Sequence, residues 1–304
     1  MWGRWVTVQS PRSVPVVVGV DGSPSSLSAT LLAARHAAAY ECPLHIVHAF
    51  NWLPRRPAPI DAGWRGTDTE TVTGPGATAK DVIRRAVSAA HTAAPGVVIT
   101  TRLLEGAATS TLLREARLAA LIAVGDGGLS TRVCLPTHSV AVHIAARAAC
   151  SVLVARSAAP SGGPIVVGVN GSPSSERALD FAFDLAARRR AELVVVRASM
   201  PIPGAGTRDY DELRVLVDLV APREDKYRLT ARVRLQRGEP EAVLVAASTR
   251  ARLIIIGARG RQPYRGLLGS AAQTLLHHSP APIILVRGLM RARLEGPRAV
   301  VPTG

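Results

Sequence analysis

An eleven-residue segment occurs twice in this chain of 304 residues. Val16–Ser26 has the sequence VVVGVDGSPSS and Ile165–Ser175 has the sequence IVVGVNGSPSS, so the two copies lie 149 residues apart and differ at two positions. Further along, the RLAALIAVG segment that ends at Gly125 corresponds to the RARLIIIG segment that ends at Gly257. Self-similarity of this kind predicts two copies of one structural unit. The length agrees, since a domain takes roughly 100–200 residues.

Short apolar runs alternate with longer segments of helical periodicity in each copy. Val16–Val20, for example, is β-branched and too short for a helix, which predicts a buried strand. Strands that alternate with helices of this length predict a parallel sheet with right-handed crossovers. We therefore expect an α/β fold with two doubly wound domains, each with a five-stranded parallel sheet. The strands expected in the first copy are 16–20, 44–49, 97–103, 120–125 and 151–155, and the helices are 27–40, 78–94, 107–118 and 138–149.

Two irregular stretches help to divide the chain. Residues 157–164 are small residues and prolines, which indicates a linker. The expected parts are an N-terminal extension (1–14), a first domain (15–156), this linker, a second domain (165–287) and a C-terminal tail (288–304). Residues 51–79 are rich in Pro, Gly and Thr without periodicity, which is typical of a lid, a binding loop or a disordered segment.

The composition excludes several classes of protein. The formal net charge is +15, but the arginines are spread over the whole length and no basic run is interleaved with aromatic residues, so nucleic-acid binding is disfavoured. Cys42, Cys134 and Cys150 form no CxxC pair, which argues against a disulfide framework and a zinc site. The sequence has neither a signal-peptide pattern nor a run of 18 apolar residues. We expect a soluble cytoplasmic protein that makes no use of a membrane.

Small and polar residues follow the strands whose carboxyl ends should carry a ligand site. The first strand of each copy leads to Asp21 or Asn170. The fourth strands lead to the turns 125–128 (GDGG) and 257–260 (GARG), and Gly269-Ser270 opens the last helix of the second copy. Glycine amides and a helix N-terminus bind phosphate groups, although tight turns alone would explain the same glycines.

These features together resemble the universal stress protein family in its tandem two-domain form, over almost the whole chain. The resemblance implies a Rossmann-like fold of the adenine nucleotide alpha hydrolase type. In nucleotide-binding members, the motif Gly, two residues, Gly, nine residues, Gly, then Ser or Thr binds the triphosphate of ATP. The positions that the resemblance carries over are Asp21, Ala49, Gly125, Gly128 and Ser139 in the first copy, and Asn170, Ala198, Gly257, Gly260, Gly269 and Ser270 in the second.

Neither copy matches the motif fully. The first has His138 in place of a glycine and adds the negative charge of Asp126. The second has Asn170 in place of the aspartate and a spacing one residue short, but adds Arg259, whose charge favours phosphate. Asparagine still forms hydrogen bonds with a ribose hydroxyl. The residues therefore favour the second copy as the ATP site.

The leading hypothesis is a tandem universal stress protein that binds ATP, with or without magnesium, and acts on a protein partner as a stress-response sensor or regulator. No general base is in place for fast catalysis, so slow hydrolysis is the most that we expect. The alternative is a scaffold that has lost its nucleotide sites and works through protein contacts alone. A dehydrogenase is disfavoured because no GxGxxG follows the first strand. The resemblance also implies that the closing strands 152–155 and 283–286 pair within the chain, and a homodimer of the whole chain is a further hypothesis.

Overall fold

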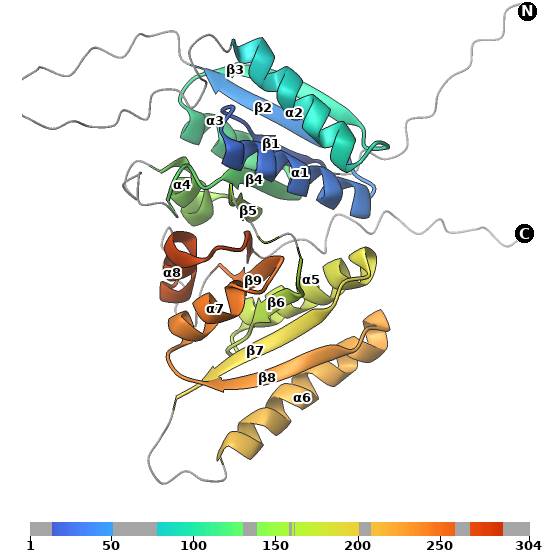
Figure 1. Cartoon of the computed structure of the whole chain (residues 1–304), viewed down its shortest axis with the longest axis vertical. Coiled ribbons are helices and arrows are strands. Elements are labelled where there is room, and N and C mark those ends of the chain that lie inside the picture. The colour runs from blue at the N-terminus through green and yellow to red at the C-terminus, as the bar shows by residue number, and fades with distance from the viewer. Residues whose placement is uncertain are drawn as a thin grey trace, which may run out of the picture.

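Ten strands form a single sheet in the computed structural model, with helices on both faces (Figure 1). The structure describes residues 14–50, 78–129, 139–157, 160, 162–200, 208–258 and 268–287. The strands are β1 (Val16–Gly19), β2 (Leu44–Phe50), β3 (Ile99–Glu105), β4 (Leu121–Gly125), β5 (Ser151–Ala155), β6 (Ile165–Gly168), β7 (Leu193–Ser199), β8 (Ala231–Arg237), β9 (Leu253–Gly257) and β10 (Ile283–Val286). The helices are α1 (Pro24–Ala39), α2 (Ala79–Ala93), α3 (Ala108–Glu115), the short 3₁₀ helix η1 (Ala116–Leu118), α4 (Val140–Arg147), α5 (Pro173–Arg189), α6 (Arg208–Tyr227), α7 (Pro240–Ser248) and α8 (Ser270–His278).

Each repeat has the doubly wound topology that the sequence predicts. The strand order is β3-β2-β1-β4-β5 in the first repeat and β8-β7-β6-β9-β10 in the second, with parallel pairing inside each repeat. The chain leaves β1 towards β2 and returns to the other side at β4, so the strand order reverses between β1 and β4. The equivalent reversal in the second repeat lies between β6 and β9. Ligands bind open parallel sheets at this place.

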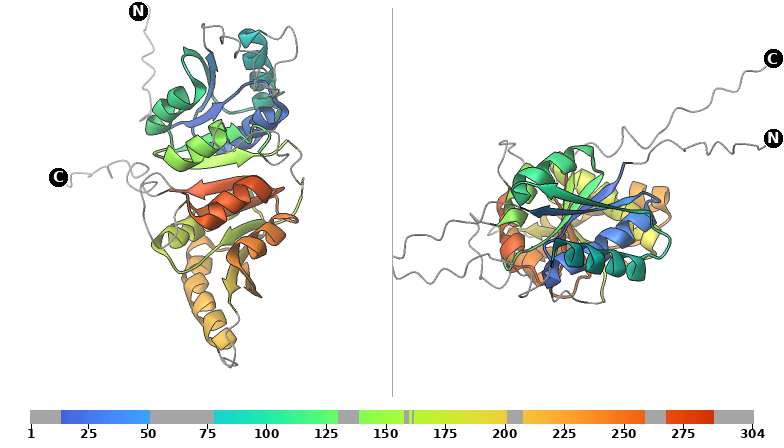
Figure 2. Two further views of the ribbon diagram at one scale, coloured as in Figure 1. Left: turned by 90° about the vertical axis from the view of Figure 1, so that its left-hand side faces the viewer. Right: turned by 90° about the horizontal axis from the view of Figure 1, so that it is seen from above.

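The two repeats join edge to edge through their closing strands, as expected. β5 and β10 pair antiparallel, with Leu153 opposite Ile284. Figure 2 shows the two halves stacked, with β5 in light green and β10 in red meeting at the centre. Because each strand covers the open edge of the other, neither is left to pair with another molecule.

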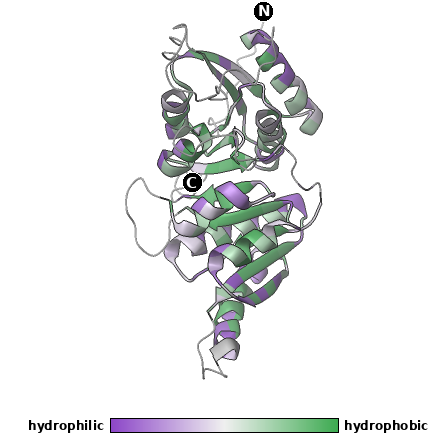
Figure 3. Cartoon of the chain, turned by 60° about the vertical axis from the view of Figure 1, so that its left-hand side comes forward, coloured by the Kyte–Doolittle hydropathy of each residue, from purple (hydrophilic) through white to green (hydrophobic). Residues whose placement is uncertain are grey.

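Two apolar layers run through both repeats, one on each face of the sheet. One layer packs α1, α2, α5 and α6 against the strands, and the other packs α3, α4, α7 and α8. The strands in the middle of the sheet are mainly hydrophobic, as Figure 3 shows, and β1, β5, β6 and β10 are buried over their whole length. This continuity of both layers across the β5–β10 junction makes the two repeats one packed unit.

Each first helix begins with the same cap, which explains why GSPSS recurs. The hydroxyl of Ser23 accepts the backbone N–H of Ser26, and Ser172 does the same for Ser175. Pro24 and Pro173 occupy the first helical turn, where a missing N–H costs nothing. The cap directs α1 and α5 away from the carboxyl ends of β1 and β6.

No helix in the described part of the chain combines the length and the hydropathy needed to cross a bilayer. The proposed lid or loop at 51–79 lies outside the described residues except for its last two positions.

Candidate functional site

A cavity of about 200 Å³ lies in the second repeat, at the place where the strand order reverses. Its walls come from the carboxyl ends of β6, β7 and β9 and from the first turns of α5, α7 and α8. Five of the positions proposed for the second copy line it: Asn170, Ala198, Gly257, Gly269 and Ser270. The other two, Arg259 and Gly260, lie outside the described residues. Residues that are up to 100 positions apart in the sequence therefore share one cavity.

The polar residue after the first strand forms the same turn in both repeats. The side-chain oxygen Oδ1 of Asn170 accepts the backbone N–H of Ser172 at 3.1 Å, and Oδ1 of Asp21 accepts the N–H of Ser23 at 2.9 Å. This bond requires an oxygen acceptor but no charge, so the exchange of aspartate for asparagine leaves the turn intact. At this turn the two repeats differ in the negative charge of the side chain alone.

Gly257, at the end of β9, is a glycine for a packing reason. A Cβ atom at this position would lie 2.5 Å from Oγ of Ser174 and 2.8 Å from its carbonyl carbon and oxygen. Gly125 in the first repeat has the same close approach, to Ser25 and Ser26. These two glycines let the first helix of each repeat approach the sheet, so their presence is not by itself evidence of phosphate binding.

Replacing Gly257 with alanine should therefore lower the free energy of unfolding by about 1–3 kcal/mol, because the helix must move away from the sheet. Urea unfolding of the purified chain measures the effect. Gly96→Ala is the matched control, since nothing lies within 4 Å of a Cβ atom there. Equal stability of the two variants would show that the close approach at Gly257 is not a constraint.

The last helix of each repeat begins differently, which the sequence motif did not predict. In the first repeat Ser139 is the N-cap, and its hydroxyl accepts the N–H of Val142 at 3.4 Å. In the second repeat the N-cap is Gly269, which has no side chain to accept such a bond, and Ser270 is the first helical residue. Ser139 and Ser270, which are equivalent in the motif, therefore differ by one position relative to the start of their helices. Among the described residues, no side chain caps the N–H groups of the first turn of α8, and this turn lines the cavity.

The remaining candidate residues of the first repeat lie at the corresponding ends of its strands. Asp21 follows β1, Ala49 is in β2, and Gly125 ends β4. Gly128 has φ +83° in the turn after β4, a conformation that favours glycine. The first repeat therefore assembles the same arrangement of backbone, apart from its last helix.

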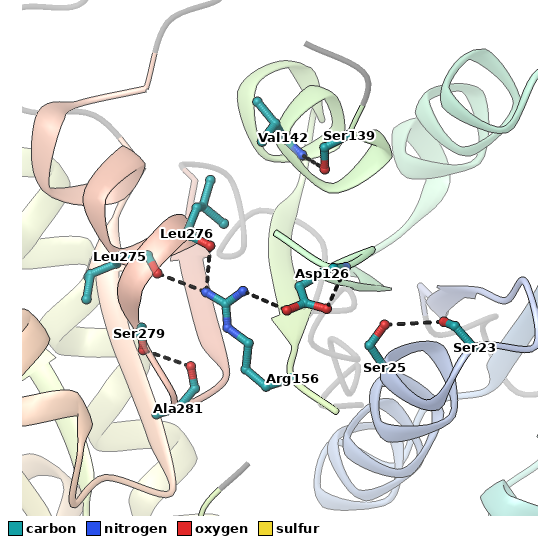
Figure 4. Close-up of polar contacts among 11 residues, drawn as sticks. Ser23, Ser25, Asp126, Ser139, Val142, Arg156, Leu275, Leu276, Ser279 and Ala281 are labelled. Atoms are coloured by element: carbon teal, nitrogen blue, oxygen red, sulfur yellow. Dashed lines mark hydrogen bonds and ion pairs between the residues drawn. The ribbon is translucent and has the colours of Figure 1, made fainter. Parts of the chain in front are cut away.

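Asp126, expected to place negative charge in this turn, is directed elsewhere. Its carboxylate is buried and accepts Nη1 of Arg156 at 3.2 Å and the N–H of Gly128 at 3.3 Å (Figure 4). Arg156 also donates through Nη2 to the carbonyls of Leu275 and Leu276, at 2.9 and 2.8 Å. An ion pair of the first repeat therefore caps the last turn of α8 in the second. Because Arg156 compensates the charge of Asp126, this carboxylate should repel a phosphate group less strongly than the sequence suggests.

The first turn of α7 was missed as a wall of the site. Pro240, Glu241 and Leu244 line the cavity. A signal was present in the sequence, because the GEPEAV segment at 238–243 combines a glycine, an early proline and acidic residues in the pattern of a helix start. This pattern predicts a helix start but not its place at the site, which depends on the packing of α7 against α8 and the sheet.

The sequence profile of the universal stress protein family matches residues 14–156 and again residues 163–287. The chain belongs to the universal stress protein family. A universal stress protein of Mycobacterium tuberculosis is 30% identical to it over 295 residues, which is 90% of this chain and 97% of the relative. A universal stress protein of Mycolicibacterium smegmatis is 26% identical over 298 residues, which is 92% and 99% of the two chains.

Among solved structures, a universal stress protein from Archaeoglobus fulgidus covers 90% of this chain and 98% of its own, at 16% identity and a TM-score of 0.65. That similarity supports the fold of the whole tandem chain. A shorter universal stress protein, solved in complex with cAMP, is 28% identical and covers 41% of this chain and 97% of its own, with a TM-score of 0.34.

Proposed function

We propose that the second repeat of this universal stress protein binds an adenine nucleotide, with ATP as its ligand. In this proposal, occupancy of the cavity changes the surface that the chain offers to a protein partner, and the chain acts as a sensor or regulator of the stress response. The observation that carries the proposal is the uncapped N-terminus of α8 at one end of the cavity.

The α8 end of the cavity is suited to phosphate. The backbone N–H groups at Gly269 and Ser270 have no side-chain cap within the described residues, and the helix dipole adds a partial positive charge. Each N–H that donates to a phosphate oxygen would contribute about 1.5–3 kcal/mol, because the bond is charge-assisted. A few such bonds are enough for micromolar binding.

Other walls of the cavity are suited to a base. Val196, Leu244 and Ile256 are apolar and line it, and Ala198 brings the end of β7 to the same cavity. Apolar walls with a few polar groups are typical of sites for flat heterocycles. The cavity thus combines apolar walls with a helix N-terminus that attracts anions.

Isothermal titration of the whole chain with ATP, with and without Mg²⁺, tests the proposal. We expect one molecule of nucleotide per chain and a dissociation constant in the micromolar range. Absence of heat at millimolar ATP would overturn nucleotide binding, and the scaffold hypothesis would then be the better account of this protein.

A further inference from the structure

Glu241 is the only charged side chain among the described residues that line the cavity. It lies in the first turn of α7 and is partly buried. Within the described part of the chain it makes no hydrogen bond or ion pair, whereas most other partly buried carboxylates here have a partner, such as Asp180 with Arg223. A carboxylate in this position is available to a ligand.

The carboxylate near the strand ends comes from a different element in each repeat. The first repeat has Asp21 after its first strand and Thr109 in the first turn of α3. The second repeat has Asn170 after its first strand and, 132 residues after Thr109, Glu241 in the first turn of α7. Each site therefore has one carboxylate at its mouth. In the second repeat that carboxylate comes from the helix that faces the strand ends.

The charge of Glu241 and its place at the rim of the cavity indicate the part of the ligand that it meets. Leu244 lies one helical turn deeper on the same face of α7 and packs over Gly168, where its Cδ2 is 2.8 Å from the place of a Cβ atom. Glu241 lies one turn nearer the N-terminus of α7 and is partly exposed, which places it at the rim of the cavity. An ionised carboxylate only accepts hydrogen bonds and repels phosphate. A nucleotide offers two kinds of donor, the ribose hydroxyls and the amino group of adenine, and the polar ribose is the part that suits a partly exposed residue at the rim.

We propose that Glu241 accepts hydrogen bonds from the 2′ and 3′ hydroxyls of the ribose and makes the site selective for ribonucleotides. Acidic side chains bind ribose hydroxyls in this way in other doubly wound folds. The inference rests on the proposed nucleotide site, and it adds a specificity-determining residue to it. The negative charge of Glu241 also orients the ligand, since it favours the triphosphate at the α8 end.

Competition titrations with ATP, 2′-deoxyATP and 3′-deoxyATP test this role. We expect the wild-type chain to bind ATP about tenfold more tightly than either deoxy analogue, which corresponds to the loss of one charge-assisted hydrogen bond. In Glu241→Gln the preference should fall to about twofold, because the neutral amide oxygen accepts hydrogen bonds from the same hydroxyls more weakly than the carboxylate does. Glu239→Gln is the matched control, because it removes the same charge from the N-cap of the same helix outside the cavity lining, and it should keep the tenfold preference.

The outcomes separate the two proposals. If the wild-type chain binds ATP and Glu241→Gln keeps its full preference for ribose, the role of Glu241 is overturned and the nucleotide site stands. If Glu239→Gln loses the preference as well, the effect comes from the charge at the end of the helix, and the role of Glu241 is again overturned. If the wild-type chain binds no ATP, both proposals fail together. Thermal melting of each variant shows that the fold is retained.

Discussion

Replacing Arg156 with methionine should lower the free energy of unfolding by about 3–5 kcal/mol, the cost of leaving one partner of a buried ion pair without its counter-charge. Arg156 and Asp126 are each 2% exposed, so the carboxylate left behind has little access to water. The carbonyls of Leu275 and Leu276 would lose a donor as well. Because these contacts join the first repeat to α8, the loss should affect unfolding of the whole chain. Urea unfolding at pH 7 measures it.

Two further variants show whether the charge pair is the cause. Asp126→Ala combined with Arg156→Met removes both charges and should be more stable than Arg156→Met alone, since the second repeat has Ala258 at the position of Asp126. Arg84→Met is the surface control, because the Arg84 side chain is 76% exposed where it pairs with Asp81, and its effect should stay within about 0.5 kcal/mol. A change of less than about 1 kcal/mol in Arg156→Met would contradict the structural role of the pair.

Acid should weaken the fold through His36, which is buried where α1 meets α5. Its ring lies 4.5 Å from that of Tyr40 and 5.9 Å from that of Phe181, measured between centroids. Burial, and then the charges of Arg189 and Arg188, lower the pKa of His36 from 6.5 to about 3. Below pH 6.5 the imidazole of His36 is protonated in the unfolded chain, whereas in the folded chain it stays neutral down to about pH 3. The stability that the neutral histidine provides is complete above pH 6.5 and is lost as the pH falls towards 3.

The variant His36→Leu isolates this contribution, since Leu185 occupies the equivalent position in the second repeat. Between pH 7 and pH 5 the wild-type chain should lose about 2 kcal/mol more stability than the variant, from the linkage between protonation and unfolding. His91→Leu, at an exposed position of α2, should keep the wild-type pH dependence. Parallel pH profiles for the wild type and His36→Leu would contradict the low pKa. Urea unfolding at a series of pH values makes the comparison.

The sequence predicts the architecture well because the fold depends on local patterns that occur twice. The β-branched run at 16–20, the GSPSS cap and the glycine that ends the fourth strand each specify a local structure that the other copy repeats. The alternation of strands and helices then leaves few topologies open. The structure confirms the doubly wound sheets and the pairing of the closing strands.

The parts of the site that the sequence does not predict depend on contacts between distant elements. The direction of the Asp126 side chain is set by Arg156 and by α8, whose carbonyls come 119 and 120 residues after Arg156. The presence of Glu241 at the cavity depends on how α7 packs against the sheet and against α8. The N-cap is Ser139 in the first repeat and Gly269 in the second, because the two helices begin one residue apart relative to the motif. A sequence motif does not predict a helix start to within one residue.

The asymmetry between the two N-caps is the basis for placing the nucleotide in the second repeat, and a matched pair of variants tests it directly. Gly269→Asp and Ser139→Asp both put a carboxylate at the N-cap of the last helix. Gly269 has φ −66° and ψ 158°, which any residue adopts, and aspartate is a favoured N-cap, so neither helix should be weakened. In titrations with ATP, we expect Ser139→Asp to bind one nucleotide as the wild type does, and Gly269→Asp to bind at least tenfold more weakly, because the carboxylate occupies the phosphate position and repels the ligand. Undiminished binding by Gly269→Asp together with weaker binding by Ser139→Asp would place the nucleotide in the first repeat and contradict this assignment.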